Sequence, residues 1–69
     1  MNKLLKAKIF ERYGTQYDFS RAVNAHESYV SRVVQERKIL PVAEQHLWAK
    51  LLGEPVSVLF GKEPVYGKR

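Results

Sequence analysis

Apolar residues recur three or four positions apart along most of the chain, and this spacing constrains the fold more than any other feature. In the stretch 3–13 the apolar residues with this spacing are Leu5, Ile9, Phe10 and Tyr13. Side chains three or four apart lie on one face of an α-helix, so such a stripe can be buried against neighbouring helices. The pattern predicts a first helix here and, because it recurs in later stretches, an all-α fold.

A capping signal and a turn signal divide the stretch 15–36 into two short helices. In "TQYD" the Thr15 hydroxyl can accept a hydrogen bond from the Asp18 amide, and the Asp18 carboxylate faces the positive end of the helix dipole. A second helix should begin there and run to about Val23, and it is too short to be stable without packing. Asn24 tolerates the left-handed backbone that a tight turn needs, so we expect the turn there and a third helix over about 27–36.

Prolines and a glycine mark two further helices. Pro41 opens a fourth helix that runs to Leu52, because Gly53 stands at the usual terminating position. A second proline-initiated turn, in "EPVSVLF", starts a fifth segment. Three of its residues should close the core: Val56, Leu59 and Phe60. We expect one compact five-helix domain over residues 1–60 and a tail, 61–69, that is either flexible or ordered by dimer formation.

The composition leaves little room for catalysis. The 69 residues include no cysteine, so no disulfide or thiolate metal site can form and the chain must fold by packing alone. The two histidines, His26 and His46, lie in different segments, and no histidine and carboxylate set has metal-ligand spacing. No glycine-rich loop could hold a phosphate. We therefore expect no enzyme activity, no metal, no cofactor and no small-molecule ligand.

Twelve Lys and Arg against seven Asp and Glu give a formal net charge of +5. The usual partners of such a surface are nucleic acid, anionic lipid or an acidic protein, although a soluble protein with a merely basic surface fits equally well. Lys6 and Lys8 interrupt the apolar run that a signal peptide would need, and no segment approaches membrane-spanning length. The sequence predicts a cytoplasmic protein.

The third predicted helix has two contrasting faces. Rotation by about 100° per residue places Val30, Val33 and Val34 on one side, which should face inward. The opposite side carries hydroxyls and long hydrogen-bonding side chains with no acidic residue between them: Ser28, Ser31, Arg32 and Gln35. An ordinary solvated face would more often mix Lys with Glu. A short helix that presents such a face after a tight turn is typical of a helix-turn-helix that enters the DNA major groove.

The stretch 16–35 resembles the helix-turn-helix of phage repressors of the Cro/CI type, within the xenobiotic-response-element group of bacterial regulators. Five residues of the stretch match the family pattern: Gln16, Phe19, Ser20, Asn24 and Val30. The likeness extends into "LPVAEQHLWAKLLGEPVSVLF", which resembles the fourth and fifth helices of that family. It implies a lambda-repressor-like bundle that binds DNA. Ser20 and Asn24 fit the pattern as a small residue and a turn residue, although Ala and Gly are commoner there, and His26 and Val42 stand where Ser often caps a helix.

The resemblance and the polar face together predict which residues read bases: Glu27, Ser28, Ser31, Arg32 and Gln35. Arg32 can bind guanine with two hydrogen bonds, and Glu27 can accept one from a cytosine amine. Two alternatives stay open. Arg32 can instead pair with Glu36, four residues further on, and Glu27 can simply stabilise the start of its helix.

Phosphate contacts are expected on both sides of this helix, from Gln16, Tyr29, Arg37 and Lys38. Lys3, Lys6 and Lys8 should form a solvated face. The large apolar residues are assigned to the core rather than to a base-stacking platform, because their spacing is that of helix faces. This core consists of Phe10, Phe19, Val23, Val30, Val33, Trp48, Leu52 and Leu59.

The sequence therefore predicts a sequence-specific regulator that binds double-stranded operator DNA, with repression implied by the family resemblance alone. One such module makes few base contacts, so we expect a homodimer on two half-sites. Apolar residues beyond the needs of the core are available for its interface: Val58, Phe60, Val65 and Tyr66. The main alternative is a protein-interaction role on the same fold, such as the antitoxin of a toxin pair. A third possibility, membrane docking, rests on the first helix alone.

Overall fold

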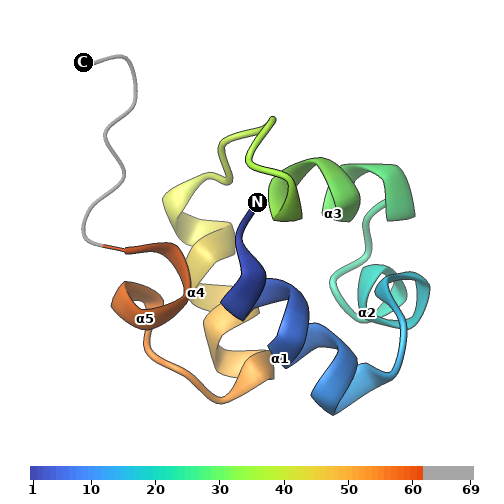
Figure 1. Ribbon diagram of the computed structural model, residues 1–69, viewed down its shortest axis with the longest axis horizontal. Helices are drawn as coiled ribbons and strands as arrows, with labels where there is room; N and C mark the ends of the chain where they lie inside the picture. Colours follow the sequence, from blue (N-terminus) through green and yellow to red (C-terminus); the bar gives the residue numbers. More distant parts are fainter. Residues whose placement is uncertain (62–69) are drawn as a thin grey trace.

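The helical periodicity of the sequence is realised as five α-helices in the computed structural model, which describes residues 1–61 (Figure 1). In chain order they are α1 (Lys3–Tyr13), α2 (Gln16–Ala22), α3 (Glu27–Val34), α4 (Val42–Leu52) and α5 (Val56–Phe60). No strand occurs within residues 1–61. The predicted all-α class and the number of helices are confirmed. The predicted tail, with Val65 and Tyr66, lies outside the described residues apart from Gly61.

Two helices begin with a side-chain cap, and three do not. Asn2 Oδ1 accepts the Leu5 N–H at 3.0 Å at the start of α1, and Thr15 Oγ1 accepts the Asp18 N–H at 3.0 Å at the start of α2. The second of these is the predicted capping bond. No side-chain cap bond occurs at the starts of α3, α4 and α5. The cap of α4 is Pro41 and not Val42, which is the first helical residue. These three helices therefore depend on packing for their starts.

The turn between α2 and α3 lies where the sequence predicts it. Asn24 has a φ of 59°, in the left-handed region that asparagine tolerates better than most residues. The Asn24 N–H donates to the Arg21 carbonyl at 3.2 Å, and the Ala25 N–H donates to the Ser20 carbonyl at 2.9 Å. This pair of bonds is a Schellman motif, which satisfies the last carbonyls of α2 and turns the chain sharply.

The third helix is shorter than predicted, because a second Schellman motif ends it at Val34. Gln35 is the cap residue rather than part of the helix, and Glu36 follows with a φ of 63°. The Glu36 N–H donates to the Val33 carbonyl at 3.0 Å, and the Arg37 N–H donates to the Arg32 carbonyl at 2.8 Å. Glycine usually occupies this left-handed position, so the sequence shows no ordinary stop signal there.

The core is formed by the inward stripes of all five helices and by one loop residue. Eleven apolar side chains are buried: Leu5, Ile9, Phe19, Val30, Val33, Val34, Leu40, Trp48, Ala49, Leu52 and Leu59. Trp48 lies among aromatic rings from other helices, with ring centroids 5.0 Å from Phe19, 6.5 Å from Tyr29 and 6.4 Å from Phe60. Its assignment to the core is therefore confirmed, and so is that of five other predicted residues. Val23 is only half-buried against the cluster.

The assignment of Phe10 to the core is wrong. Its side chain is 42% exposed, and the Lys6 ammonium lies 5.8 Å from the centre of its ring. The inward stripe of α1 consists of Leu5, Ile9 and Tyr13, which are four residues apart. Phe10 is one residue beyond Ile9, a rotation of about 100° around the helix, and this rotation carries it off the buried stripe.

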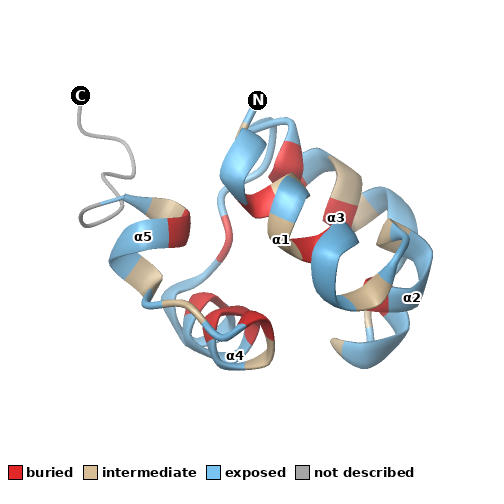
Figure 2. Ribbon diagram, turned by 60° about the horizontal axis from the view of Figure 1, so that its bottom comes forward, coloured by how far each residue is buried: buried red, intermediate tan, exposed pale blue. Residues whose placement is uncertain are grey.

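Helix α1 lies in the middle of the bundle and contacts each of the other four helices. Helices α2 and α3 contact each other on one side of it, and α4 and α5 contact each other on the other side (Figure 1). The radius of gyration is 11.1 Å, close to the roughly 11 Å expected for a compact domain of this size. In this arrangement α3 lies at the edge of the bundle, with one long side facing solvent (Figures 1 and 2).

Candidate nucleic-acid interface

The two faces of α3 differ sharply in burial. Val30, Val33 and Val34 face inward, with exposed fractions of 0%, 5% and 2%. On the opposite side Ser28, Arg32 and Gln35 are exposed, and Ser31 is half-buried. The ribbon of α3 in Figure 2 carries both buried and exposed positions. The structure thus confirms which side of α3 faces inward, and the rigid valine side holds the polar side in place.

Arg32 is not paired with Glu36. Within residues 1–61 the Arg32 guanidinium makes no ion pair, whereas Glu36 Oε1 lies 3.3 Å from the amino group of Met1. The left-handed backbone at Glu36 ends the helix before this residue, so Arg32 and Glu36 do not share a helical face. The ion-pair alternative for Arg32 is therefore wrong in this structure.

The remaining base-reading candidates lie along the same side or at its start. Gln35 Nε2 donates to Ser31 Oγ at 3.3 Å, so these two side chains adjoin one another at the end of α3. Glu27 is exposed in the first turn of α3. Its carboxylate there is close to the positive end of the helix dipole, and both predicted roles for it remain compatible with this position.

Tyr29 and Lys38, two of the predicted phosphate contacts, form a small cluster with a residue of α4. The Tyr29 hydroxyl donates to Glu44 Oε1 at 3.2 Å, and the Lys38 ammonium lies 5.5 Å from the centre of the Tyr29 ring. Such a cation–π contact holds Lys38 near the flank of α3 while its charge stays exposed. The Tyr29 hydroxyl, by contrast, already bonds a carboxylate, which a phosphate would have to replace.

The other two predicted phosphate contacts lie apart, one at the start of α2 and one after the end of α3. Gln16 is the first residue of α2 and is half-buried. Arg37 is exposed just after α3, where its backbone N–H donates to the Arg32 carbonyl. The structure therefore gathers Arg32, Arg37 and Lys38 around the end of α3 and leaves Gln16 at the start of the neighbouring helix.

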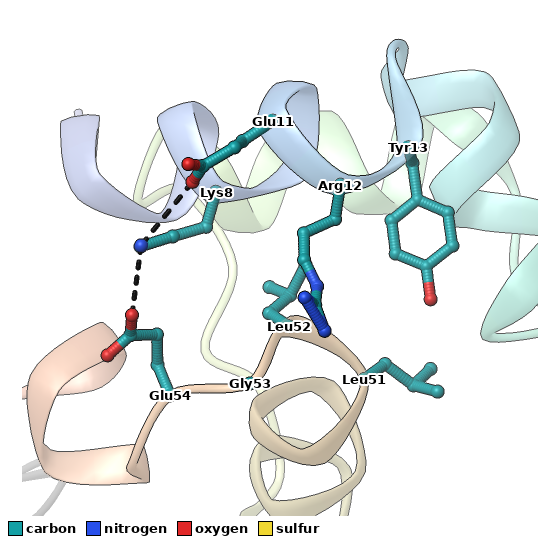
Figure 3. A pocket seen from close by; sticks show the side chains of 8 residues that line it. All are labelled: Lys8, Glu11, Arg12, Tyr13, Leu51, Leu52, Gly53 and Glu54. Atoms are coloured by element: carbon teal, nitrogen blue, oxygen red, sulfur yellow. Dashed lines mark ion pairs between the residues drawn. The ribbon is translucent and has the colours of Figure 1, made fainter.

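The lysines of α1 do not form the predicted solvated face. Lys8 Nζ lies 2.9 Å from Glu54 Oε2 and 3.4 Å from Glu11 Oε1, in a cleft of about 640 Å³ between α1 and the α4–α5 junction (Figure 3). Hydrogen bonds to Glu54 and then to Glu11 raise the pKa of Lys8 above its ordinary value of 10.5. Lys6 is half-buried beside the Phe10 ring, so Lys3 is the exposed one of these three lysines.

Two residues near the interface were missed by sequence reasoning. Glu44 contacts Tyr29 from fifteen residues away, and Asn2 reaches both α3 and α5. Asparagine directly before a helical stretch is a capping signal, and "MNK" carries it, so the contact of Asn2 with α1 could have been predicted. Its contacts with α3 and α5 depend on the tertiary structure and leave no trace in local sequence.

Other kinds of site find no support in the part of the chain that the structure describes. No group of three or more His, Cys, Asp or Glu side chains there could hold a metal ion, and both histidines are exposed. Every helix within residues 1–61 is too short or too polar to span a lipid bilayer. Comparison with known proteins found no matching family model, no matching curated protein and no matching solved structure.

Proposed function

We propose that this chain is a sequence-specific DNA-binding regulator of the phage-repressor kind, with a lambda-repressor-like fold. The observation that carries the proposal is the division of α3 between a buried valine stripe and an open stripe of Ser28, Arg32 and Gln35. An α-helix is about as wide as the B-DNA major groove, roughly 12 Å, so an edge helix with one open side can lie in it. Two short helices in contact, joined by a left-handed turn at Asn24, are the elements from which a helix-turn-helix is built, and they support the proposal.

Base recognition is assigned to the open stripe of α3 and to its first turn. Arg32 is exposed and free of an ion pair within residues 1–61, so its guanidinium can offer two parallel hydrogen bonds to guanine O6 and N7. Beside it, the hydroxyls of Ser28 and Ser31 offer short hydrogen-bonding groups, and the amide of Gln35 offers a longer one. Glu27 accepts from a cytosine amine when a C·G pair lies opposite the start of α3.

Phosphate contacts are assigned to side chains around this stripe. Arg37 and Lys38 follow α3 directly and are exposed, and Gln16 begins α2. Contacts of this type fix the position of a protein on the duplex and make its affinity fall as the salt concentration rises. Tyr29 contributes through its ring, which holds Lys38, more than through its hydroxyl, which Glu44 engages.

A two-fold dimer completes the proposal, because one short helix contacts too few base pairs for useful specificity. Helix α5 provides an apolar surface for it, since Val58 is 45% exposed on this helix. The regulatory outcome that follows most simply is repression, by occupation of an operator near a promoter. Sedimentation over a range of concentrations measures whether the dimer forms, and Val58→Glu should weaken it.

The decisive experiment is a selection of bound duplexes from a random pool, followed by a salt titration on the selected site. The proposal predicts a short enriched sequence with two related half-sites and an affinity that falls steeply with salt. A matched pair of variants strengthens the test, because Arg32→Ala and Arg12→Ala remove the same charge from α3 and α1. Enrichment of no sequence at all by the wild-type protein would overturn the proposal.

A protein-interaction role on the same fold, such as that of an antitoxin, is the second candidate. The observation that favours it is a shallow depression of about 510 Å³ beside the α2–α3 turn, lined in part by Val23, Ala25 and the 42% exposed Leu47. A protein partner would cover such apolar side chains. Co-purification with one defined partner, together with no enrichment of duplexes, would favour this candidate over DNA binding.

A further inference from the structure

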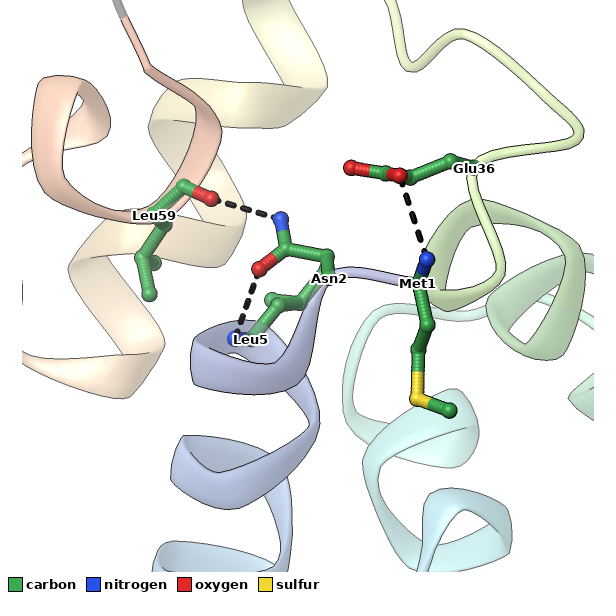
Figure 4. Close-up of polar contacts among 5 residues, drawn as sticks. All are labelled: Met1, Asn2, Leu5, Glu36 and Leu59. Atoms are coloured by element: carbon green, nitrogen blue, oxygen red, sulfur yellow. Dashed lines mark hydrogen bonds and ion pairs between the residues drawn. The ribbon is translucent and has the colours of Figure 1, made fainter.

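Asn2 connects three helices through hydrogen bonds of both its backbone and its side chain, and Figure 4 shows the side-chain bonds. Its side-chain Oδ1 accepts the Leu5 N–H at 3.0 Å, and its backbone carbonyl accepts the Lys6 N–H at 3.1 Å, which starts α1. Its side-chain Nδ2 donates to the Leu59 carbonyl of α5 at 2.7 Å, and its backbone N–H donates to the Val34 carbonyl of α3 at 2.7 Å. A single residue thus fixes the start of one helix to the ends of two others.

The bond to Val34 completes the end of α3. The last carbonyls of a helix lack partners within it, and an unpaired buried carbonyl costs about 1–3 kcal/mol. Three of them are satisfied locally: the Ser31 carbonyl by Gln35, the Arg32 carbonyl by Arg37 and the Val33 carbonyl by Glu36. The fourth, that of Val34, has no local partner within residues 1–61 and instead receives the N–H of Asn2.

This bond acts at the point where the proposed interface changes from helix to loop. Val34 directly precedes Gln35, and the cationic residues Arg37 and Lys38 follow within four positions. The Val34 carbonyl is part of the planar peptide unit that joins Val34 to Gln35, so holding this carbonyl holds the orientation of that unit. Fixing this carbonyl therefore fixes the path on which the chain leaves α3 and carries these cations.

We propose that Asn2 is a positioning residue for DNA binding, which sets the phosphate-contacting segment 35–38 by holding the Val34 carbonyl. The proposal rests on the proposed DNA-binding function and extends it to a residue that touches no DNA. The side chain of Asn2 bonds α1 and α5, and only its backbone N–H bonds α3, so the positioning role belongs to the backbone bond to Val34.

The test compares Asn2→Pro with Asn2→Ala on the selected duplex. Both variants lack the side-chain amide and the cap, but only proline also lacks the backbone N–H, and its ring occupies the space of the Val34 carbonyl. The readout is the slope of log affinity against log salt concentration, measured at a temperature where circular dichroism shows both variants folded. A change in stability alone leaves this slope intact for the folded molecules.

We expect Asn2→Ala to keep the wild-type slope. The slope of Asn2→Pro should be shallower, by an amount that corresponds to about one to two phosphate contacts. Amide hydrogen exchange at Glu36 and Arg37 should also be faster in the proline variant than in the alanine variant. Equal slopes for the two folded variants would overturn the proposal while leaving DNA binding intact. Failure of the wild-type protein to bind any selected duplex would overturn the proposed function and this inference with it.

A backbone variant keeps the test decisive if Asn2→Pro does not fold. The chain is 69 residues long, so chemical synthesis can replace the peptide bond between Met1 and Asn2 with an ester. The ester keeps the Asn2 side chain, the cap of α1 and the bond to Leu59, and it removes only the N–H that Val34 accepts. A reduced salt slope for the ester supports the positioning role, and an unchanged slope overturns it.

Discussion

Helices α1 and α3 both carry basic side chains, but these side chains have different partners. On α1, Lys8 lies between Glu11 and Glu54 and joins this helix to the α4–α5 junction. On α3, Arg32 makes no ion pair within residues 1–61 and lies on an open stripe with hydroxyl and amide side chains. The first arrangement stabilises the bundle, and the second leaves a cation available to a partner.

This difference shows why a count of basic residues predicts a binding surface poorly. A lysine that already has two carboxylate partners must give them up before it can bind a phosphate, and the exchange gains little. An exposed arginine without such partners gains the full interaction and releases the counterions of the DNA. The net charge of +5 therefore matters less than the location of the unpaired cations.

The largest expected effect is that of Arg32→Ala. It should cost about 1–3 kcal/mol of binding free energy on the selected duplex and relax the base preference at one position, because a two-bond contact with guanine is lost. Competition binding with cognate and random duplexes measures both effects. Arg12→Ala, with the same change in charge on α1, should leave the base preference unchanged. Equal losses on cognate and random duplexes for Arg32→Ala would remove it from the base-reading set.

Lys38→Ala should have the next largest effect. It should weaken binding to all sequences alike and reduce the salt slope by about one, since a phosphate contact carries no sequence information. Lys50→Ala provides the matched control, because Lys50 is an exposed lysine on α4. A loss confined to the cognate site, or an equal loss in the Lys50 variant, would contradict the assigned role.

Glu36→Gly tests the end of α3 and should stabilise the protein. The left-handed backbone at Glu36 is unfavourable for a residue with a Cβ, and glycine should recover roughly 0.5–1 kcal/mol after its own entropy cost. Urea unfolding followed by circular dichroism measures the change. The exposed contact of Glu36 with the Met1 amino group offsets little of this gain. A clear loss of stability would show that the carboxylate contributes more than its geometry indicates.

The smallest effect concerns Lys8 and is visible only at high pH. Hydrogen bonds to Glu54 and Glu11 raise the pKa of Lys8 in the folded state above 10.5, so its contribution to stability is complete below pH 10.5. The contribution is lost as the pH rises above 10.5 and through the raised pKa, because the unfolded chain then releases the proton first. Urea unfolding of the wild type and of Glu54→Gln can be measured between roughly pH 9 and 11.5, around that value. The free energy of unfolding should depend less on pH in the variant. DNA binding at neutral pH should not change.

Local signals predicted the helices well and the tertiary contacts poorly. Thr15, Asn24 and Gly53 act within one turn of their own position, and each marks the boundary that the sequence indicates. Glu36 gives no such signal, because a left-handed glutamate is unfavourable by itself and is held here by the hydrogen bonds at the end of α3. Phe10 was misplaced because periodicity gives the relative angle of residues on a helix and leaves the direction of the core uncertain by one position.

The candidate interface was predictable to a similar degree. The identity of the open side of α3 follows from the spacing of its three valines, so Ser28, Arg32 and Gln35 could be assigned from sequence. The engagement of Tyr29 by Glu44 and the support from Asn2 could not be assigned, because each links segments that are distant in the chain. Sequence patterns therefore predict which side chains lie on the open side of α3, and the contacts that position these side chains require the structure.

Trp48 gives the molecule a built-in optical reporter. It is the sole tryptophan of the chain, and its indole is 1% exposed between rings from α2, α3 and α5. Loosening of the bundle should let water reach the indole and shift its emission to longer wavelengths. Unfolding can therefore be followed at this fluorophore without any attached dye.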